Sequence, residues 1–298
     1  MSLYKLLLIV LLLAVPQPAR AVVLVDQLGR QVNLPALPKR VVALAPSIVE
    51  IVFELGASDR LVGATEYSDF PAAAKQLPRV GSYVRPDVER IVALKPDLCL
   101  AIKDGNPEYM VTQLAGFGIP VYVIDPRSIN DIIDVIDRYG HLLGVRERSQ
   151  QTVIAMRSRL AAVAARLART STKPLVFFQI DAAPIISAGT GTFINELITL
   201  AGGRNVAAGA TPYPHFNWED ILHLQPEVVM VASMAGGHSV QDLVAGWQKW
   251  RQIPAVKNSR VHVVDANLID RPTPRLLDGL EAFARIIHPD SFGSLDDH

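Results

Sequence analysis

The chain contains the stretch Tyr83-Val-Arg-Pro-Asp-Val-Glu-Arg-Ile-Val-Ala-Leu-Lys-Pro-Asp-Leu98 and repeats its pattern later as Tyr213-Pro-His-Phe-Asn-Trp-Glu-Asp-Ile-Leu-His-Leu-Gln-Pro-Glu-Val228. The tyrosines, the glutamates Glu89 and Glu219, and the apolar and proline positions agree without a gap. Solenoid repeats recur every ~20–50 residues, far less than the spacing of these two stretches. The repeat therefore predicts two related lobes that face each other and contribute equivalent residues to the space between them.

The N-terminus has the pattern of an export signal. Lys5 precedes an apolar run over residues 6–15, and Ala19-Arg20-Ala21 supplies small residues around a cleavage point. A bilayer span needs about 20 apolar residues, which makes an uncleaved anchor the weaker alternative. No cysteine follows the run, so no lipid anchor is expected. We predict a signal peptide over residues 1–21 and a protein exported to the periplasm.

Charge and cysteine content exclude several function classes. The chain has 29 basic and 29 acidic residues, and removal of residues 1–21 takes away Lys5 and Arg20 but no acid. This balance gives no electrostatic case for nucleic acid as a partner. The single cysteine, Cys99, lies in an apolar run, which predicts a buried and unreactive thiol.

Short apolar strands alternate with helices in both halves of the chain. Strands are predicted at 41–44, 98–102, 121–124, 175–180, 228–232 and 261–264. Caps at Ser47 (a capping box with Glu50), Asn106 and Ser128 predict three helix starts in the first half. Helices at 193–201, 218–224, 240–247 and 274–287 are predicted in the second. The alternation predicts an α/β fold with two Rossmann-like lobes, each with a mostly parallel central sheet covered by helices on both sides.

One helix is predicted between the two halves. Residues 146–169 contain no Gly or Pro and place one apolar stripe along a helix, formed by Val153, Met156, Leu160, Val163, Ala164 and Leu167. Such a helix would be about 36 Å long. It either joins the two lobes or packs wholly within one of them. The first alternative divides the chain into an N-terminal lobe at 22–145, a linking helix at 146–170 and a C-terminal lobe at 171–298.

Several segments together resemble a known family. They are Tyr67-Ser-Asp-Phe-Pro71, Glu89 to Leu98 of the repeat, Gln113-Leu-Ala-Gly-Phe-Gly-Ile119, Ala201-Gly-Gly-Arg-Asn205 and Arg271-Pro-Thr-Pro-Arg275. The chain resembles the helix-linked (class III) periplasmic substrate-binding proteins, which serve ABC importers of cobalamin, iron-siderophores and haem. The resemblance covers nearly all of the chain after residue 21 and is greatest to the cobalamin binders of this family.

The resemblance implies a docking role for the repeated glutamates. In the family, two glutamates at the tips of the lobes pair with arginines of the membrane permease, and they correspond to Glu89 and Glu219. Each lies in the first turn of a predicted helix, after Asp87 or Asn217. The alternative is that these acids only favour the helix dipole, an effect worth about 0.3–1 kcal/mol without any partner.

The resemblance also implies a set of ligand-lining positions. Tyr67 corresponds to a lining tyrosine, whereas Tyr83 and Tyr213 stand where the cobalamin binder has tryptophans. A further tryptophan is replaced by Ile102, and two phenylalanines by Ile180 and Ile186. An expected aspartate is replaced by Asn267, and Arg271 is retained. Paired aromatic walls suit a large flat ligand, although ordinary packing is the alternative for any one tyrosine.

No catalytic or metal-binding constellation is visible in the sequence. His215 and His238 are the histidines that could face the cleft, but a zinc-type site needs three or four converging ligands. Gly189-Thr-Gly191 lacks the Walker ending, and we interpret it as a turn before a helix. No Gly-x-Ser-x-Gly elbow is present. We therefore expect no enzyme activity, no cofactor and no resident metal.

The functional expectation is a monomeric periplasmic binding protein of an ABC importer. It would capture cobalamin or a related corrinoid between its lobes and deliver it to the permease and ATPase complex in the inner membrane. The tyrosines in place of tryptophans keep an iron-siderophore or haem binder of the same class as the alternative. An enzyme or metal-cluster protein on the same scaffold is the third hypothesis.

Overall fold

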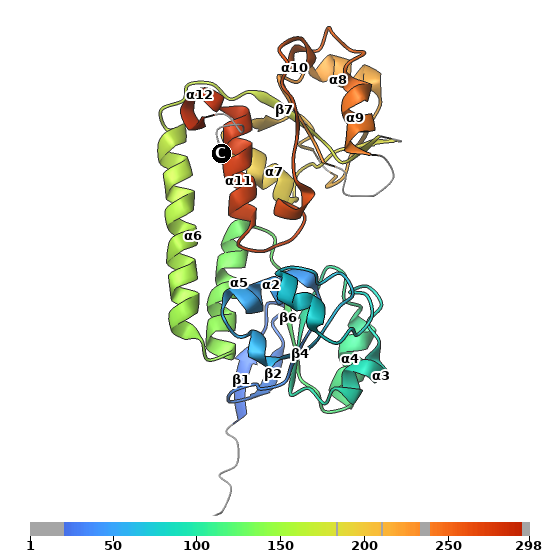
Figure 1. The fold of residues 1–298 in the computed structure, drawn as a ribbon, viewed down its shortest axis with the longest axis vertical. Helices are drawn as coiled ribbons and strands as arrows, with labels where there is room; N and C mark the ends of the chain where they lie inside the picture. The colour runs from blue at the N-terminus through green and yellow to red at the C-terminus, as the bar shows by residue number, and fades with distance from the viewer. Residues whose placement is uncertain (1–20, 183, 210, 233–238, 294–298) are drawn as a thin grey trace, which may run out of the picture.

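The computed structural model describes residues 21–182, 184–209, 211–232 and 239–293. The predicted signal peptide lies outside the described residues except for Ala21, the first residue of β1 (Ala21–Val25). None of the helices in the described ranges has the length and apolar character needed to cross a membrane. Two lobes stand one above the other in Figure 1, and a long helix runs alongside both.

Each lobe is built on a four-stranded parallel sheet. The N-terminal sheet has the order β4-β3-β5-β6 and the C-terminal sheet the order β10-β7-β12-β13. In each of these sheets, the first strand along the chain lies between the second and the third, and the fourth lies beyond the third. The bounds are β3 (Val41–Ala43), β4 (Leu61–Ala64), β5 (Leu98–Ile102), β6 (Val121–Ile124), β7 (Leu175–Gln179), β10 (Arg204–Asn205), β12 (Val228–Val231) and β13 (Val261–Val263).

Helices cover both faces of each sheet, as predicted. In the N-terminal lobe, Leu98 and Leu100 of β5 face one core while Cys99 and Ala101 face another, because successive side chains point to opposite sides of a strand. The first core lies under α2 (Pro46–Glu54) and α5 (Ile129–Leu142), the second under α3 (Val88–Ala93) and α4 (Glu108–Gly116). In the C-terminal lobe, α7 (Phe193–Leu200) and α11 (Leu276–Ile287) cover one face, and α8 (Trp218–Leu224), α9 (Val240–Trp247) and α10 (Pro254–Lys257) cover the other.

The long helix α6 (Arg146–Leu167) contacts both lobes. It packs against α5 in the N-terminal lobe and against α11 and α12 (Pro289–Phe292) in the C-terminal lobe. The Arg148 Nε donates to the carbonyl of Glu54 (3.1 Å), while Arg159 donates to Glu281 (2.8 Å) and Asp278 (2.6 Å) of α11. Of the two alternatives, the inter-lobe helix is therefore confirmed. One apolar core runs along α6 and includes side chains from both lobes.

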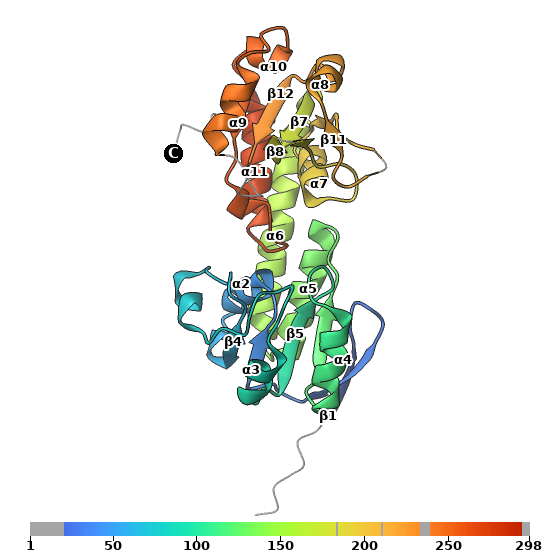
Figure 2. The same cartoon turned by 90° about the vertical axis from the view of Figure 1, so that its right-hand side faces the viewer.

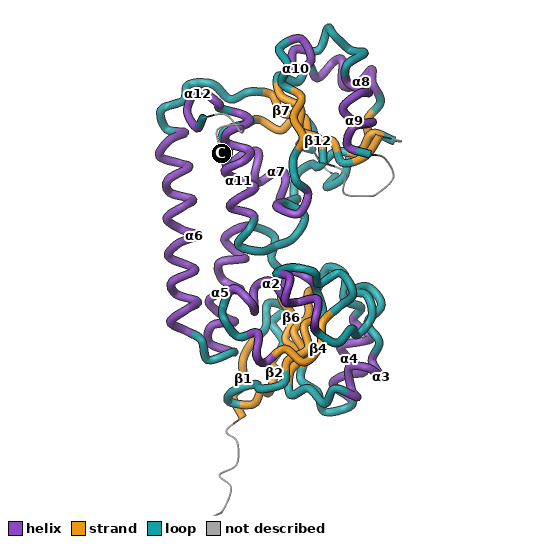
Figure 3. The backbone as a smooth tube through the Cα atoms, viewed as in Figure 1, coloured by secondary structure: helices purple, strands orange, loops and turns teal. Residues whose placement is uncertain are grey.

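The remaining elements are small. β1 and β2 (Gln31–Pro35) form an antiparallel hairpin at the base of the N-terminal lobe, as Figure 3 shows. In the C-terminal lobe, β8 (Asp181–Ala182), β9 (Ile185–Ile186) and β11 (His215–Phe216) form a second antiparallel sheet. Three short 3-10 helices complete the described chain: η1 (Ser58–Arg60), η2 (Ala72–Gln76) and η3 (Ala266–Leu268).

Two of the predicted helix caps are wrong for the same physical reason. α2 begins at Pro46, after Ala45, so Ser47 and Glu50 lie inside the helix, where both are buried. The cap of α4 is Pro107, and the Asn106 side chain instead bonds to the backbone of Leu44, Tyr83 and Ile102. The local pattern assigns Glu50 and Asn106 to caps, but their side chains bond to groups that are distant in the sequence. Ser128 caps α5 as predicted, accepting from the Asp131 N–H.

The two repeated stretches share their helix caps and one unusual backbone conformation at equivalent positions. Asp87 caps α3 and Asn217 caps α8, and each helix leads into the third strand of its sheet. Lys95 (φ 48°) and Gln225 (φ 44°) occupy the left-handed conformation at equivalent positions, each followed by a proline. Since non-glycine residues rarely adopt this conformation, the shared geometry supports two lobes built to one plan.

Candidate ligand-binding cleft

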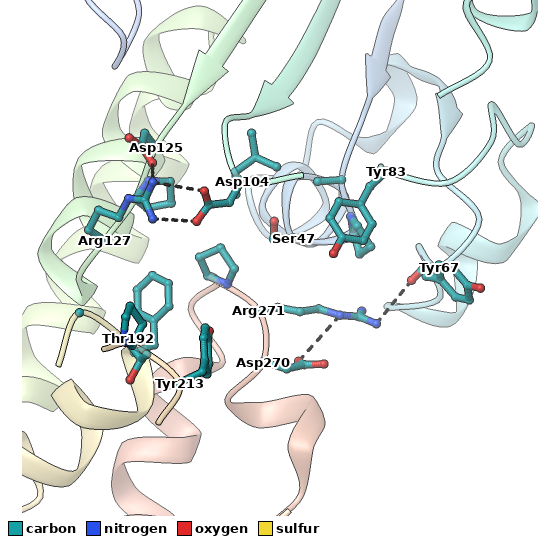
Figure 4. A pocket seen from close by; sticks show the side chains of 18 residues that line it. Ser47, Tyr67, Tyr83, Asp104, Asp125, Arg127, Thr192, Tyr213, Asp270 and Arg271 are labelled. Carbon is teal, nitrogen blue, oxygen red and sulfur yellow. Dashed lines mark hydrogen bonds and ion pairs between the residues drawn. The ribbon is translucent and has the colours of Figure 1, made fainter. Parts of the chain in front are cut away.

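The main cavity lies between the lobes and has a volume of about 810 Å³ (Figure 4). Its N-terminal wall is formed by residues that follow the carboxyl ends of β3, β5 and β6, such as Ser47, Asp104 and Arg127. In the sheet order β4-β3-β5-β6, the chain leaves β3 and β5 in opposite directions, and ligands of open α/β sheets bind at this kind of crevice. The volume is at the upper end of the ~300–1,000 Å³ of small-molecule sites.

Five of the six predicted ligand-binding positions line this cavity: Tyr67, Tyr83, Ile102, Tyr213 and Arg271. Asn267 is not among the lining residues. It lies exposed in η3, where its backbone and side-chain nitrogens both donate to the Asp265 carboxylate at 2.9 Å. The ligand-binding role of the five residues remains a prediction that their placement makes testable.

Each lobe holds its repeated tyrosine in a different way. Tyr83 is fixed by the Asn106 side chain, which donates to its carbonyl at 2.7 Å, and by Gly105, where an added Cβ would overlap the tyrosine ring. Tyr213 is fixed through its neighbours, because the carbonyls of Pro212 and Pro214 accept from the N–H groups of Gly189 (2.7 Å) and Ser187 (3.1 Å). Tyr83 is 38% exposed and Tyr213 60% exposed, so both rings leave surface that a ligand can cover.

A side chamber of about 390 Å³ adjoins the cavity in the C-terminal lobe. It shares Thr192, Phe193, Tyr213 and Asp270 with the main cavity and adds apolar walls from Ile180 and Ile186. His215 also lines the chamber, whereas His238 lies outside the described residues. Within the described ranges, no group of three or more His, Cys, Asp or Glu side chains is placed to hold a metal ion.

Charged groups in the cavity are already paired with one another. Arg127 donates to Asp104 at 2.7 Å and contacts Asp125 at 2.7 Å, and Lys103 also pairs with Asp125 at 2.9 Å. Although partial burial opposes it, the two aspartates raise the pKa of Arg127. The Arg127 guanidinium therefore stays charged, is held in place in the wall, and has its charge balanced by the two aspartates.

Arg271 pairs with acids of the opposite lobe. It donates to Glu50 of α2 at 2.8 Å and to Asp69 at 3.1 Å. Asp270, its neighbour in the same lobe, lies 3.9 Å from its Nε. Burial raises the pKa of Glu50, and the nearby arginines offset only part of that rise. For the exposed Asp69, burial acts in the raising direction, but the bond to Arg271 lowers its pKa overall. Arg271 thus takes part in an ion-pair cluster between the lobes and also lines the cavity.

Comparison with known proteins identifies the family. The family model described as "Periplasmic binding protein" matches residues 41–268. The chain belongs to the periplasmic binding protein family. A relative in Vibrio cholerae serotype O1, named vitamin B12-binding protein, is 34% identical over 248 residues, covering 82% of this chain and 87% of the relative. A relative of the same name in Yersinia pseudotuberculosis is 33% identical, covering 88% of this chain and 90% of the relative.

Solved structures of this family share the two-lobed fold. The periplasmic vitamin B12 binding protein BtuF of Vibrio cholerae superimposes with a TM-score of 0.73 at 32% identity, covering 84% of this chain and 96% of the other. A periplasmic heme binding protein of Pseudomonas aeruginosa superimposes with a TM-score of 0.75 at 28% identity, covering 86% of this chain and 94% of the other. The predicted family and the predicted fold class are confirmed.

The first-turn glutamates of this periplasmic binding protein are both exposed. Glu89 lies in the first turn of α3 and Glu219 in the first turn of α8, and neither takes part in an ion pair with a residue of the described ranges. Figures 1 and 2 place α3 and α8 on the side of the molecule away from α6, one helix on each lobe. The two helices whose first turns contain these glutamates therefore lie on a common side of the molecule.

Several cavity residues of this binding protein were not predicted from the sequence. Asp104, Asp125 and Arg127 follow the ends of β5 and β6, and Phe193 begins α7 after the Thr192 cap. The available signal was their place after predicted parallel strands, where binding residues gather. No motif marks them, and the resemblance assigned them no role. Cys99 is buried as predicted, and burial raises the pKa of its thiol.

Proposed function

We propose that the protein captures cobalamin or a related corrinoid between its lobes in the periplasm and delivers it to an ABC importer. The observation that carries the proposal is the inter-lobe cavity lined by Tyr83 and Tyr213, equivalent residues of the repeated stretches. Such rings bury about 150–250 Å² each, which suits a large ligand held from two sides. The two relatives named vitamin B12-binding proteins match more than four-fifths of the chain and support the same ligand class.

The charge arrangement favours a ligand without strong negative charge. Of the charged residues that line the main cavity, Asp104, Asp125 and Asp270 are acidic, and only Arg127 and Arg271 are basic. Both arginines are already paired with carboxylates. A corrinoid presents mostly neutral amides, whereas haem presents two propionates that would meet no unpaired arginine among these lining residues. Burying such charges without a partner is unfavourable.

Delivery is proposed to use Glu89 and Glu219 as contacts with the permease. Both acids are exposed, and the helices that carry them lie on the same side of the molecule. Release of the ligand requires the importer to bind more tightly to a lobe arrangement with low ligand affinity, because a partner shifts an equilibrium only by its differential affinity. The protein itself acts as a monomeric binder and catalyses no reaction, in line with relatives that are named as binding proteins.

Calorimetric titration of the protein lacking residues 1–21 tests this proposal. The panel contains cyanocobalamin, dicyanocobinamide, haemin and a ferric hydroxamate siderophore. We expect saturable 1:1 binding of the corrinoids and much weaker binding of the two iron ligands. Binding of haemin or the siderophore alone would overturn the corrinoid proposal.

A haem or ferric siderophore binder is the second candidate. Three tyrosines line the cavity, and a tyrosine hydroxyl can ligate ferric iron. The heme-binding protein of Pseudomonas aeruginosa has the same fold. A charge-transfer band after incubation with haemin, lost in Tyr67→Phe, Tyr83→Phe or Tyr213→Phe, would favour this candidate over the corrinoid.

A further inference from the structure

An ion-pair cluster joins the lobes beside the cavity. Glu50 of α2 and Asp69 belong to the N-terminal lobe, whereas Arg271 and Arg275 belong to the C-terminal lobe. Arg271 Nη1 lies 2.8 Å from Glu50 Oε1 and 3.1 Å from Asp69 Oδ1, and Arg275 Nη1 lies 3.5 Å from Glu50 Oε2. These pairs connect residues that are more than 200 positions apart in the sequence.

Glu50 is at the centre of this cluster and is its most buried member. Its side chain is 4% exposed, compared with 17% for Arg271 and 56% for Asp69. Ion pairs are stronger away from water, and removing one partner of a buried pair leaves a charge without compensation. Apart from the ion pair with Arg275, Glu50 Oε2 has no hydrogen-bond partner among the described residues. The carboxylate therefore depends on the two arginines of the other lobe.

Contacts next to the cluster hold the same two segments together. The Arg275 guanidinium lies over the Phe70 ring, 4.1 Å from its centroid, and Arg271 Nη2 donates to the carbonyl of Tyr67 at 3.4 Å. Tyr67 and Arg271 both line the cavity, whereas Glu50 does not. Any effect of Glu50 on a ligand must therefore act through the position of Arg271 and the separation of the lobes.

We propose that Glu50 is a positioning residue that fixes the spacing of the two lobes and the orientation of Arg271, and so sets how long a ligand stays in the cleft. The inference rests on the proposed function, because it requires the cleft to bind a ligand. Another contact between the lobes is made by Glu196 of α7, which accepts from the Ile129 N–H at the start of α5 (3.0 Å). The helix α6 and this contact join the lobes without the cluster, so Glu50 controls their relative position rather than their association.

The test compares Glu50→Gln with the matched control Glu54→Gln. Glu54 is an exposed glutamate of the same helix whose partner is Arg148 of α6, 3.6 Å away. Stopped-flow displacement with cyanocobalamin gives the dissociation rate. We expect Glu50→Gln to raise it by about tenfold or more, the change expected when one charge-assisted hydrogen bond is lost. Glu54→Gln should leave the rate unchanged.

A distance measurement tests the positioning role without any ligand. Spin labels on Gln113→Cys in α4 and Lys257→Cys in α10 report the separation of the lobes, and the buried thiol of Cys99 stays unlabelled. Glu50→Gln should broaden or shift the distance distribution, and Glu54→Gln should not. In an Arg271→Gln background, Glu50→Gln should change rate and distance much less than it does alone, because only the longer ion pair with Arg275 (3.5 Å) remains to be lost.

The outcomes separate this inference from the proposed function. If no corrinoid binds to the unmodified protein, the proposed function fails, and the distance measurement alone decides whether Glu50 positions the lobes. If the corrinoid binds but Glu50→Gln matches Glu54→Gln in both rate and distance, the positioning role is overturned. Should Glu50→Gln not fold, Arg275→Gln takes away the partner of Glu50 Oε2 without changing a residue that lines the cavity. It should shift both readouts in the direction expected for Glu50→Gln, and no shift would overturn the proposal.

Discussion

The two lobes share one framework but hold their cleft residues differently. Asp97 in the N-terminal lobe accepts from the Lys39 and Arg40 N–H groups at 2.8 and 2.9 Å, and its counterpart Glu227 accepts from the Leu175 N–H at 2.7 Å. In both lobes an acid after the repeated helix thus holds the start of the first strand. Tyr83, by contrast, is held by an asparagine side chain and a glycine, whereas Tyr213 is held by backbone bonds of its neighbours. The bonds that hold the strand starts are therefore alike in the two lobes, whereas the contacts that hold the cleft tyrosines differ.

Removal of both docking acids should give the largest effect on function. Glu89→Ala combined with Glu219→Ala is expected to abolish transport, because loss of a hydrogen-bonded charge pair at an interface costs about 2–5 kcal/mol. Ligand affinity should be nearly unchanged, since neither acid lines the cavity. Uptake of labelled cyanocobalamin and calorimetry measure the two quantities.

The single variants show whether the lobes dock equally. Equal partial losses for Glu89→Ala and Glu219→Ala would show that both lobes contribute alike. Glu108→Ala is the control, because Glu108 is an exposed first-turn acid of another helix, α4. A large loss of ligand affinity in the double variant would contradict the assigned role.

Removal of either repeated tyrosine should weaken ligand binding by a smaller amount. Tyr83→Ala and Tyr213→Ala are each expected to cost about 1–3 kcal/mol of binding free energy, by analogy with the loss of one buried side chain. Tyr109→Ala, which removes an exposed tyrosine that does not line the cavity, is the matched control. An unchanged dissociation constant in either variant would remove that tyrosine from the site.

The glycine next to Tyr83 offers a test of how that ring is held. Gly105→Ala should weaken binding by less than Tyr83→Ala does, because the added Cβ displaces the ring rather than removing it. Gly118→Ala is the matched control, because Gly118 also has a positive φ (74°) but no atom lies within 4 Å of an added Cβ, and it should leave affinity unchanged. Equal affinities of the two glycine variants would show that Tyr83 is held by Asn106 alone.

The matched left-handed residues should give the smallest effect. Lys95→Gly and Gln225→Gly are each expected to raise the free energy of unfolding by up to about 1 kcal/mol, because relief of the left-handed cost of about 1–2 kcal/mol outweighs the entropy cost of glycine. Denaturant titration measures both changes. Similar gains in the two lobes would support a shared framework, and a loss at either position would show that its side chain makes a contact of greater value.

The sequence predicted what depends on local pattern and missed what depends on distant partners. β5 and β6 have the predicted bounds because their buried apolar runs are short and well delimited. Glu50 and Asn106 were interpreted as parts of helix caps, but their partners, Arg271 and Leu44, lie far away in the sequence. No local pattern contains that information.

The cleft was predicted in the same uneven way. The repeat identified Tyr83 and Tyr213 as wall candidates because equivalent positions of related lobes face a common space. Asn267 was expected in the cleft by resemblance, but a 3-10 turn bonds its amide to Asp265. Arg127 was missed because its one signal, a place after a predicted strand, is shared with ordinary loop residues, and no motif distinguishes it from a surface arginine.

The helix α6 has a consequence for how the protein unfolds. Because its side chains belong to a core that includes residues of both lobes, neither half can lose its packing without exposing apolar surface of the other. We therefore expect the halves to melt together in one cooperative heat-absorption peak, although their sheets share no strand. A two-lobed protein can in this way behave as a single thermodynamic unit.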